Sequence, residues 1–198
     1  PGKATVIVGM RRVGKTTFLN QLRQERLDQG VPRHLLPCIN FEDERLAGLE
    51  ASHLGFLLDE FERAVERKSE RDRILWCFDE IQVVPGWERF VRRLLDRGDV
   101  DIAATGSSAD LLSREIATSL RGRGWMIPLF PFGFAEYVAH RKEAIPDPRR
   151  PIPGNERLRM ERRSLEWLKE GGFPEAQGLE PATRRQLLLD YVDVAMLR

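Results

Sequence analysis

A stretch near the start of the chain has the residue types and the spacing of a loop that binds phosphate groups. It reads Gly-Met-Arg-Arg-Val-Gly-Lys-Thr-Thr over 9–17 and fits the pattern G-x-x-x-x-G-K-[ST]. An apolar β-branched run precedes it at 4–8, and apolar residues at helical spacing follow it, so the local order is strand, loop, helix. The alternative is an ordinary glycine turn with an exposed lysine.

The positions in this stretch have separate tasks in phosphate binding. Gly9 and Gly14 are expected to adopt backbone angles closed to other residues and to leave room for phosphate oxygens. Successive backbone N–H groups then form an anion nest at the start of the helix. Lys15 is expected to reach the β- and γ-phosphates, and the Thr16 hydroxyl to bind Mg²⁺. The residues expected to bind the nucleotide are Gly9, Met10, Arg11, Arg12, Val13, Gly14, Lys15, Thr16 and Thr17.

Two adjacent carboxylates follow the most strand-like apolar run of the chain. Ile-Leu-Trp-Cys-Phe at 74–78 suits a strand buried on both faces of a parallel sheet, and Asp79 and Glu80 come directly after it. In open α/β sheets, ligands bind at the carboxyl ends of the strands. We therefore expect Asp79 to hold the Mg²⁺ of the bound phosphates and Glu80 to act as general base on an attacking water. A polar strand end without chemistry is the alternative.

Two further segments carry polar side chains suited to such a site. A short strand at 101–105 leads into Gly-Ser-Ser at 106–108, where one of the hydroxyls at the strand tip is expected to position water or the γ-phosphate; a helix N-cap is the other role, and the two are compatible. The basic, glycine-bounded run at 119–124 contains Arg121 and Arg123. Either one is a candidate for stabilising transition-state charge, in cis or from a neighbouring subunit, and a turn with surface arginines is the alternative.

Strand-like and helical patterns alternate around these segments and predict an α/β fold. Further strands are expected at 35–41, where Pro37 indicates an edge position, and at 125–129. Helices are expected at about 15–29, 52–69 with Ser52 as N-cap, 87–97 with Trp87 as a core anchor, from 131, at 155–170 and from 183. The Pro-rich stretch near 145–155 predicts a phosphate-binding core at 1–145 and a helical extension or lid at 146–198.

Composition is that of an ordinary globular protein. The chain has 198 residues, 41% of them hydrophobic and 32% charged, with a net charge of +1 that does not call for a nucleic-acid partner. Cys38 and Cys77 each sit in an apolar strand-like run, so we expect buried thiols in a reducing compartment and a cytoplasmic location. No apolar run approaches the roughly 18 residues of a membrane span. Both ends of the sequence suggest a fragment of a longer protein.

At 9–16, 79–80 and 105–108 the chain resembles the additional-strand P-loop ATPases. The chain is more closely similar to one prokaryotic AAA+ group. The similarity lies in the runs at 9–17, 78–82 (Phe-Asp-Glu-Ile-Gln), 105–123, 131–137 (Pro-Phe-Gly-Phe-Ala-Glu-Tyr) and 171–175 (Gly-Gly-Phe-Pro-Glu). This group is the archaeal-type "ATP-binding protein" ATPases, which usually continue into a C-terminal domain of unknown function.

The resemblance implies a three-layer P-loop NTPase fold with a central parallel sheet of about five strands in the order 5-1-4-3-2. It implies ATP and Mg²⁺ as ligands, a metal-side role for Asp79, a water-activating role for Glu80, and a sensor-like polar role for the segment at 105–108, with Ser107 the chosen residue. It also implies a segment before the first strand that helps to hold the base, and a C-terminal domain, so base specificity and the output of hydrolysis depend on parts that the 198 residues do not contain.

Four functions are compatible with these residues. The favoured one is Mg-ATP hydrolysis by water attack, with hydrolysis coupled to conformational change. The second is a nucleotide-gated binding module with negligible turnover. Glu80 favours the enzyme over this module, because only the enzyme needs a general base. The third is a small-molecule phosphotransferase, which would need a site for the molecule that accepts the phosphate, and the sequence shows no residues dedicated to one. A DNA-linked ATPase would use the arginine pairs at 92–93, 162–163 and 184–185. A homo-oligomer and an unidentified protein partner are left open, and no membrane partner is expected.

Overall fold

The computed structural model describes residues 2–65, 73–107, 120, 122–147 and 149–196, with the backbone alone described at 194–196. Arg121 and Ser108 lie outside these residues, as do positions 66–69 of the helix expected at 52–69. The chain packs as two compact units. The first comprises Pro1–Met10 and Gly14–Leu129, and the second comprises Arg11–Val13 and Phe130–Arg198.

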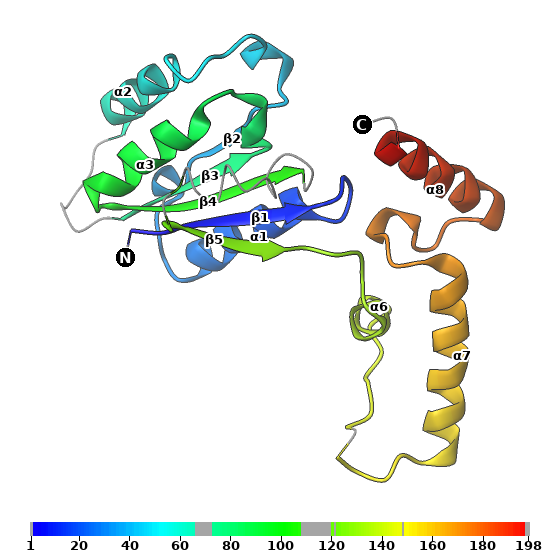
Figure 1. The fold of residues 1–198 in the computed structure, drawn as a ribbon. Helices are drawn as coiled ribbons and strands as arrows, with labels where there is room; N and C mark the ends of the chain where they lie inside the picture. Colours follow the sequence, from blue (N-terminus) through cyan, green and yellow to red (C-terminus); the bar gives the residue numbers. More distant parts are fainter. Residues whose placement is uncertain (1, 66–72, 108–119, 121, 148, 197–198) are drawn as a thin grey trace. The chain divides into compact units, whose positions relative to one another are not determined.

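A five-stranded parallel sheet forms the centre of the first unit (Figure 1). Its strands are β1 (Ala4–Gly9), β2 (Cys38–Asn40), β3 (Ile74–Asp79), β4 (Val100–Ser107) and β5 (Gly124–Pro128). They lie in the order β2-β3-β4-β1-β5, which confirms the order expected from the resemblance. Because all neighbours are parallel, the carboxyl ends meet at one edge: Gly9 lies opposite Ser107, and Asn40 lies opposite Asp79.

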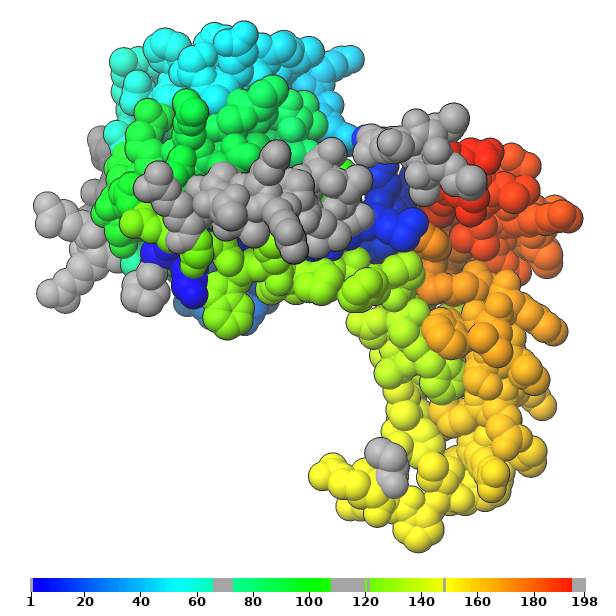
Figure 2. All heavy atoms as spheres, in the orientation of Figure 1, coloured from blue at the N-terminus to red at the C-terminus, as the bar shows by residue number. Residues whose placement is uncertain are grey.

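Helices cover both faces of this sheet, as expected of a three-layer fold. α1 (Lys15–Asp28) lies on one face, and α2 (Leu54–Ala64) and α3 (Trp87–Arg97) lie side by side on the other (Figures 1 and 2). α3 ends at Gly98, which has a φ of 79° and closes the helix by donating its N–H to the Leu95 carbonyl.

Alternation along β3 explains the two core layers. Ile74, Trp76 and Phe78 point to the α2–α3 face, while Leu75 and Cys77 point to the α1 face with Leu19 of that helix. Aromatic contacts stiffen the first layer: the Trp76 ring centroid lies 5.6 Å from that of Phe78 and 4.7 Å from that of Phe61. Trp87 is 2% exposed and belongs to this layer, which confirms the expected core anchor.

Three expected elements differ from the structure in their bounds. A 3-10 turn at Arg33–Leu35 precedes β2, so this edge strand is shorter than the expected 35–41. α2 begins at Leu54 with His53 at its N-cap, so Ser52 is not the cap, and it ends at Ala64, short of the expected 69, because Val65 is extended. The helix expected from residue 131 begins at Phe134, since Gly133 takes the N-cap position and its N–H is bound by the Glu136 side chain at 2.8 Å.

Cys38 and Cys77 are neighbours in register on β2 and β3 but differ in exposure. The expectation that both thiols are buried is wrong for Cys38, because it lies on an edge strand and is exposed. Burial raises the pKa of Cys77 to about 12. We expect iodoacetamide at pH 8 to alkylate Cys38 in the native protein and Cys77 only after unfolding, as measured by peptide mass spectrometry. Equal native rates for the two thiols would contradict this assignment.

Helices make up the second unit. They are α6 (Phe134–His140), α7 (Gly154–Glu170) and α8 (Pro181–Met196), with a 3-10 turn at Pro174–Ala176. Glu170 at the end of α7 accepts hydrogen bonds from the Tyr137 hydroxyl at 3.1 Å and from Arg141 at 2.7 Å, and it pairs with Arg184 of α8 at 3.2 Å. One carboxylate therefore connects all three helices.

The backbone just before α6 contacts the backbone just after α7, at Phe132 and Gly172. The N–H of Phe132 donates to the carbonyl of Gly172 at 2.7 Å, and a Cβ at Gly172 would lie 2.4 Å from the Phe132 carbonyl oxygen. The ring N–H of Trp167 also donates a hydrogen bond to the Phe132 carbonyl oxygen, at 3.1 Å. The two motifs at 131–137 and 171–175 thus pack against each other, and Gly172 is required because a side chain has no room there.

The boundary between the two compact units falls after Leu129, whereas the sequence suggests a domain boundary later, in the Pro-rich stretch near 145–155. The division into 1–145 and 146–198 stays a prediction about domains. None of the helices within the described residues is both long enough and apolar enough to cross a bilayer.

Candidate functional site

The glycine-rich loop joins the end of β1 to the start of α1. Gly14 has a φ of 104°, a left-handed conformation that a residue with a side chain adopts only with strain. The space around it is open, with no atom within 4 Å of an added Cβ. Gly9 differs from the expectation: it ends a β-strand and is not among the positive-φ residues, so the backbone argument applies to Gly14 and is wrong for Gly9.

Lys15 is the best-enclosed cation of the site. Only 4% of it is exposed, and its Nζ lies 3.3 Å from the Gly9 carbonyl oxygen, 3.1 Å from that of Met10 and 3.1 Å from Glu80 Oε1. An ammonium group has three N–H donors, so these three acceptors satisfy it. The loop is therefore closed around a buried charge that is fully compensated by protein oxygens.

The Asp79 carboxylate receives a hydroxyl group on each oxygen. Thr16 of α1 donates to Oδ2 at 2.7 Å, and Thr105 of β4 donates to Oδ1 at 2.5 Å. The structure thus brings together Thr16 and Asp79, the two residues predicted to face the metal. Within the described residues, no group of three or more His, Cys, Asp or Glu side chains is arranged to hold a metal ion. A divalent ion here would take oxygens from Thr16 and Asp79 and complete its shell with phosphate and water, which is the donor set that Mg²⁺ prefers.

Glu80 sits in a strained turn and is held from three sides. Its φ of 51° is left-handed, which is uncommon for a residue with a side chain. Its N–H donates to the Thr105 hydroxyl at 3.0 Å, its Oε2 accepts from Gln82 at 2.7 Å, and its Oε1 pairs with Lys15. These contacts fix the carboxylate beside the loop lysine.

Sequence reasoning gave no individual role to two residues of this arrangement, Gln82 and Thr105, although Thr105 lies in the segment 105–108 that was expected to have a polar role. Thr105 contacts both acidic residues from the end of β4, and Gln82 contacts Glu80. The parallel order of β3 and β4 was the available signal for Thr105, because it places the last residues of these neighbouring strands together. Ser107, the residue chosen for that tip, is 5% exposed and lies in register with Gly9.

The remaining candidates lie elsewhere on the chain. Arg123 pairs with Asp96 of α3, and its carbonyl accepts the Ala4 N–H, while Arg121 is outside the described residues. Met10 and Thr17 are exposed at the loop. The three middle residues of the loop, Arg11–Val13, pack with the second unit.

Arg12 has a partner network within that second unit. It has a left-handed φ of 65°, and its Nη1 donates to both carboxylate oxygens of Glu175, at 2.7 and 2.8 Å. The Tyr191 hydroxyl donates to Glu175 at 2.6 Å, and the Arg12 guanidinium lies 5.5 Å from the Tyr191 ring centroid. Burial and the hydrogen bond to Glu175 raise the pKa of Tyr191 to about 12, and the hydrogen bonds from Tyr191 and Arg12 lower the pKa of Glu175.

Two curated relatives match almost the whole chain. A protein of Methanocaldococcus jannaschii described as uncharacterised is 38% identical over 194 residues, which cover 98% of this chain and 41% of the relative. A protein of Haemophilus influenzae, also described as uncharacterised, is 31% identical over 194 residues, covering 97% of this chain and 44% of that one. The chain therefore spans less than half the length of these relatives.

The fold has a counterpart among solved structures, and the sequence matches a family. AMPPCP-bound DnaA from Aquifex aeolicus superposes with a TM-score of 0.51 at 14% identity, covering 94% of this chain and 54% of that chain. This likeness concerns the fold alone. Residues 1–138, well over half of the chain, match the family described as AAA domain. The chain belongs to this AAA domain family and contains an AAA+-type P-loop ATPase domain.

Proposed function

We propose that the chain binds Mg-ATP at residues 9–17 and hydrolyses it by attack of water on the γ-phosphate. The observation that carries this proposal is a cluster at the carboxyl edge of the sheet, in which the buried Lys15, Asp79, Glu80 and Thr105 and the exposed Thr16 are joined by hydrogen bonds and one ion pair. Family membership supports nucleotide binding, and the acidic pair supports hydrolysis.

The residues have distinct tasks in this proposal. Lys15 and the loop N–H groups bind and orient the β- and γ-phosphate oxygens. Thr16 and Asp79 hold Mg²⁺, which when bound neutralises charge on the same oxygens. Glu80 accepts a proton from the attacking water at a carboxylate oxygen, while the bond between the γ-phosphorus and the β,γ-bridging oxygen breaks to leave ADP and phosphate. Thr105 positions the Asp79 carboxylate and the backbone of Glu80, and Ser107 remains the candidate for contact with the γ-phosphate.

Conformational coupling belongs to the same proposal. Arg11–Val13 are part of the phosphate loop by sequence and part of the second unit by packing, so occupation of the loop is expected to change the contacts of these residues. The reporters are the Arg12 ion pair with Glu175 and the hydrogen bond from Tyr191. Roles for Arg121 or Arg123 in a homo-oligomer stay predictions.

The test is ligand-dependent thermal stability combined with phosphate release. At 100 times its Kd, a ligand that binds only the folded state adds about 2.7 kcal/mol, which raises Tm by roughly 5–10 °C for a chain of this size. We expect this shift with Mg-ATP and with Mg²⁺ plus a non-hydrolysable analogue, and a smaller one with EDTA. Steady-state phosphate release indicates the enzyme. A shift without turnover indicates the nucleotide-gated module, and no shift with any nucleotide contradicts the proposal.

A further inference from the structure

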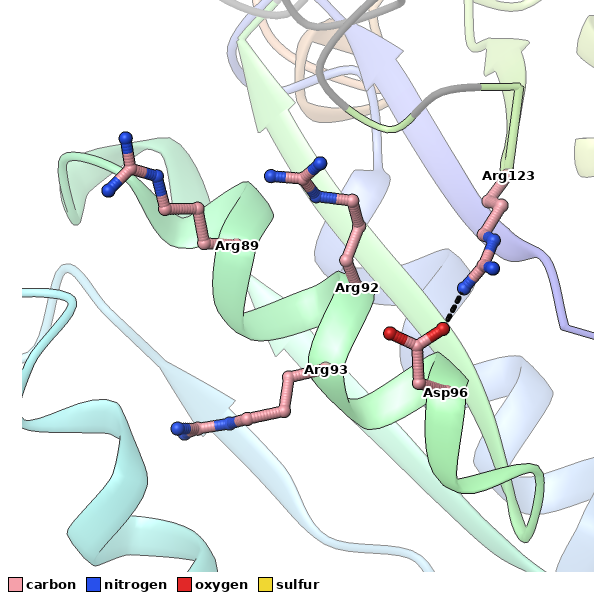
Figure 3. Close-up of a pocket in the computed structure, with 5 residues that line it drawn as sticks. All are labelled: Arg89, Arg92, Arg93, Asp96 and Arg123. Carbon is pink, nitrogen blue, oxygen red and sulfur yellow. Dashed lines mark hydrogen bonds and ion pairs between the residues drawn. The ribbon is translucent and has the colours of Figure 1, made fainter.

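A second cationic site lies on α3, away from the phosphate loop. A pocket of about 400 Å³ is lined by four arginines and one acid: Arg89, Arg92, Arg93, Asp96 and Arg123. We call it the α3 arginine pocket. Figure 3 shows Arg89 and Arg92 projecting to the same side of α3, one helical turn apart, while Arg123 reaches Asp96 from the segment before β5. All five residues belong to the first unit.

Among the described residues, most of the positive charge in this pocket has no acidic partner. Of the four arginines, only Arg123 has an ion pair with a described residue, to Asp96. Arg93 rests over the Phe90 ring at 5.6 Å. The Nε of Arg92 is buried and has no hydrogen-bond partner among the described residues. Three of the four arginines therefore have no ion pair with a described residue, and the described lining of the pocket is strongly positive.

We propose that the α3 arginine pocket binds the sugar-phosphate backbone of a nucleic-acid strand. Neighbouring guanidinium groups on one helix face match a ligand that repeats its negative charge along a chain, because residues three apart on a helix lie about 5–6 Å apart at Cβ. The described residues that line the pocket are four arginines and one aspartate, with no aromatic ring to stack on a base, so contacts would be to phosphate and carry no sequence preference.

Phosphate fits this pocket better than the carboxylate of an acidic peptide. A planar carboxylate can be satisfied by a single arginine fork. Asp96 in this pocket already pairs with one arginine, Arg123. A tetrahedral phosphate group can accept from two guanidinium groups at once, here those of the exposed Arg89 and the half-buried Arg92, whose side chains project to the same side of α3. This inference goes beyond nucleotide hydrolysis, and it requires no bound nucleotide.

The test is fluorescence anisotropy with a labelled 20-nucleotide DNA strand and the protein without added ATP, over a range of salt concentrations. For Arg89→Ala/Arg92→Ala we expect about tenfold weaker binding, and a slope of log K against log salt that is shallower by about 1.4, since about 0.7 is lost per phosphate contact on a single strand. The matched control is Arg162→Ala/Arg185→Ala, which removes the same charge from two exposed arginines of α7 and α8 and should leave binding unchanged.

Arg92 is half-buried, so Tm is measured for each variant, and Arg89→Lys/Arg92→Lys provides a version with its charge intact. The lysine variant should bind within about threefold of the unmodified protein. Equal binding by the alanine variant, or equal loss in the α7–α8 control, overturns the proposal. Tighter binding of poly-glutamate or of free tripolyphosphate than of the DNA strand at this pocket also overturns it. Since ATP is absent, none of these results depends on whether the loop at 9–17 turns over nucleotide.

Discussion

Lys15→Ala is expected to weaken nucleotide binding by at least about 100-fold, because it removes the buried cation that faces the phosphates. Titration with a fluorescent ATP analogue measures the effect. Lys169→Ala, an exposed lysine on α7, is the matched control and should bind as the unmodified protein does. Unchanged affinity in Lys15→Ala would refute the placement of the phosphates at residues 9–17.

A loss of stability has to be separated from a loss of binding in that experiment. Lys15 is the partner of Glu80, and a buried carboxylate left without its cation destabilises a fold by about 3–5 kcal/mol. The double variant Lys15→Ala/Glu80→Gln removes both charges. It should recover most of the Tm lost in Lys15→Ala and still fail to bind nucleotide. A double variant that regains binding would show that Lys15 acts through the fold and not through contact with phosphate.

Glu80→Gln is expected to bind Mg-ATP and to turn over about 10²–10⁴ times more slowly, because the amide cannot accept the proton from water. Single-turnover phosphate release measures the chemical step, and the fluorescent analogue measures binding in the same preparation. Glu180→Gln replaces an exposed glutamate of the second unit and should keep full activity. Normal turnover in Glu80→Gln would refute its role as base.

The geometry adds a reason to measure binding carefully in Glu80→Gln. In the described structure the carboxylate is one of the three acceptors that satisfy the Lys15 ammonium. A triphosphate that binds the Lys15 ammonium has to displace one of these three acceptors. Replacing Glu80 removes the competing anion, so we expect the variant to bind ATP somewhat more tightly than the unmodified protein.

Local pattern was sufficient for most of the first unit. The run at 74–78 is apolar at every position because both faces of β3 are covered, and Pro37 indicates an edge because it cannot complete a ladder on both sides. The strand order itself came from the resemblance. The errors were at boundaries and at Cys38, whose exposure depends on what packs over an edge strand and is not encoded in the run around it.

The site was predicted in its charged residues and in Thr16, while the contacts of Thr105 and Gln82 were not predicted. Lys15, Asp79 and Glu80 stand out because burying a charge requires a reason. Thr105 does not stand out, because a threonine near the end of a strand has many common structural roles. Its contact with Asp79 depends on β3 and β4 being adjacent in the sheet. Gln82 is similar: only the left-handed turn at Glu80 brings its amide onto the carboxylate.

The contact between Phe132 and Gly172 affects how the second unit can vary. Since the two backbones touch there without an intervening side chain, the chain from 132 to 172 forms a loop tied at its neck. The free energy of closing a loop rises only slowly with its length. Insertions into the Pro-rich bend between α6 and α7, or a single proteolytic nick there, should therefore leave the neck fastened and the two helices together, which makes that bend a tolerant point for added sequence.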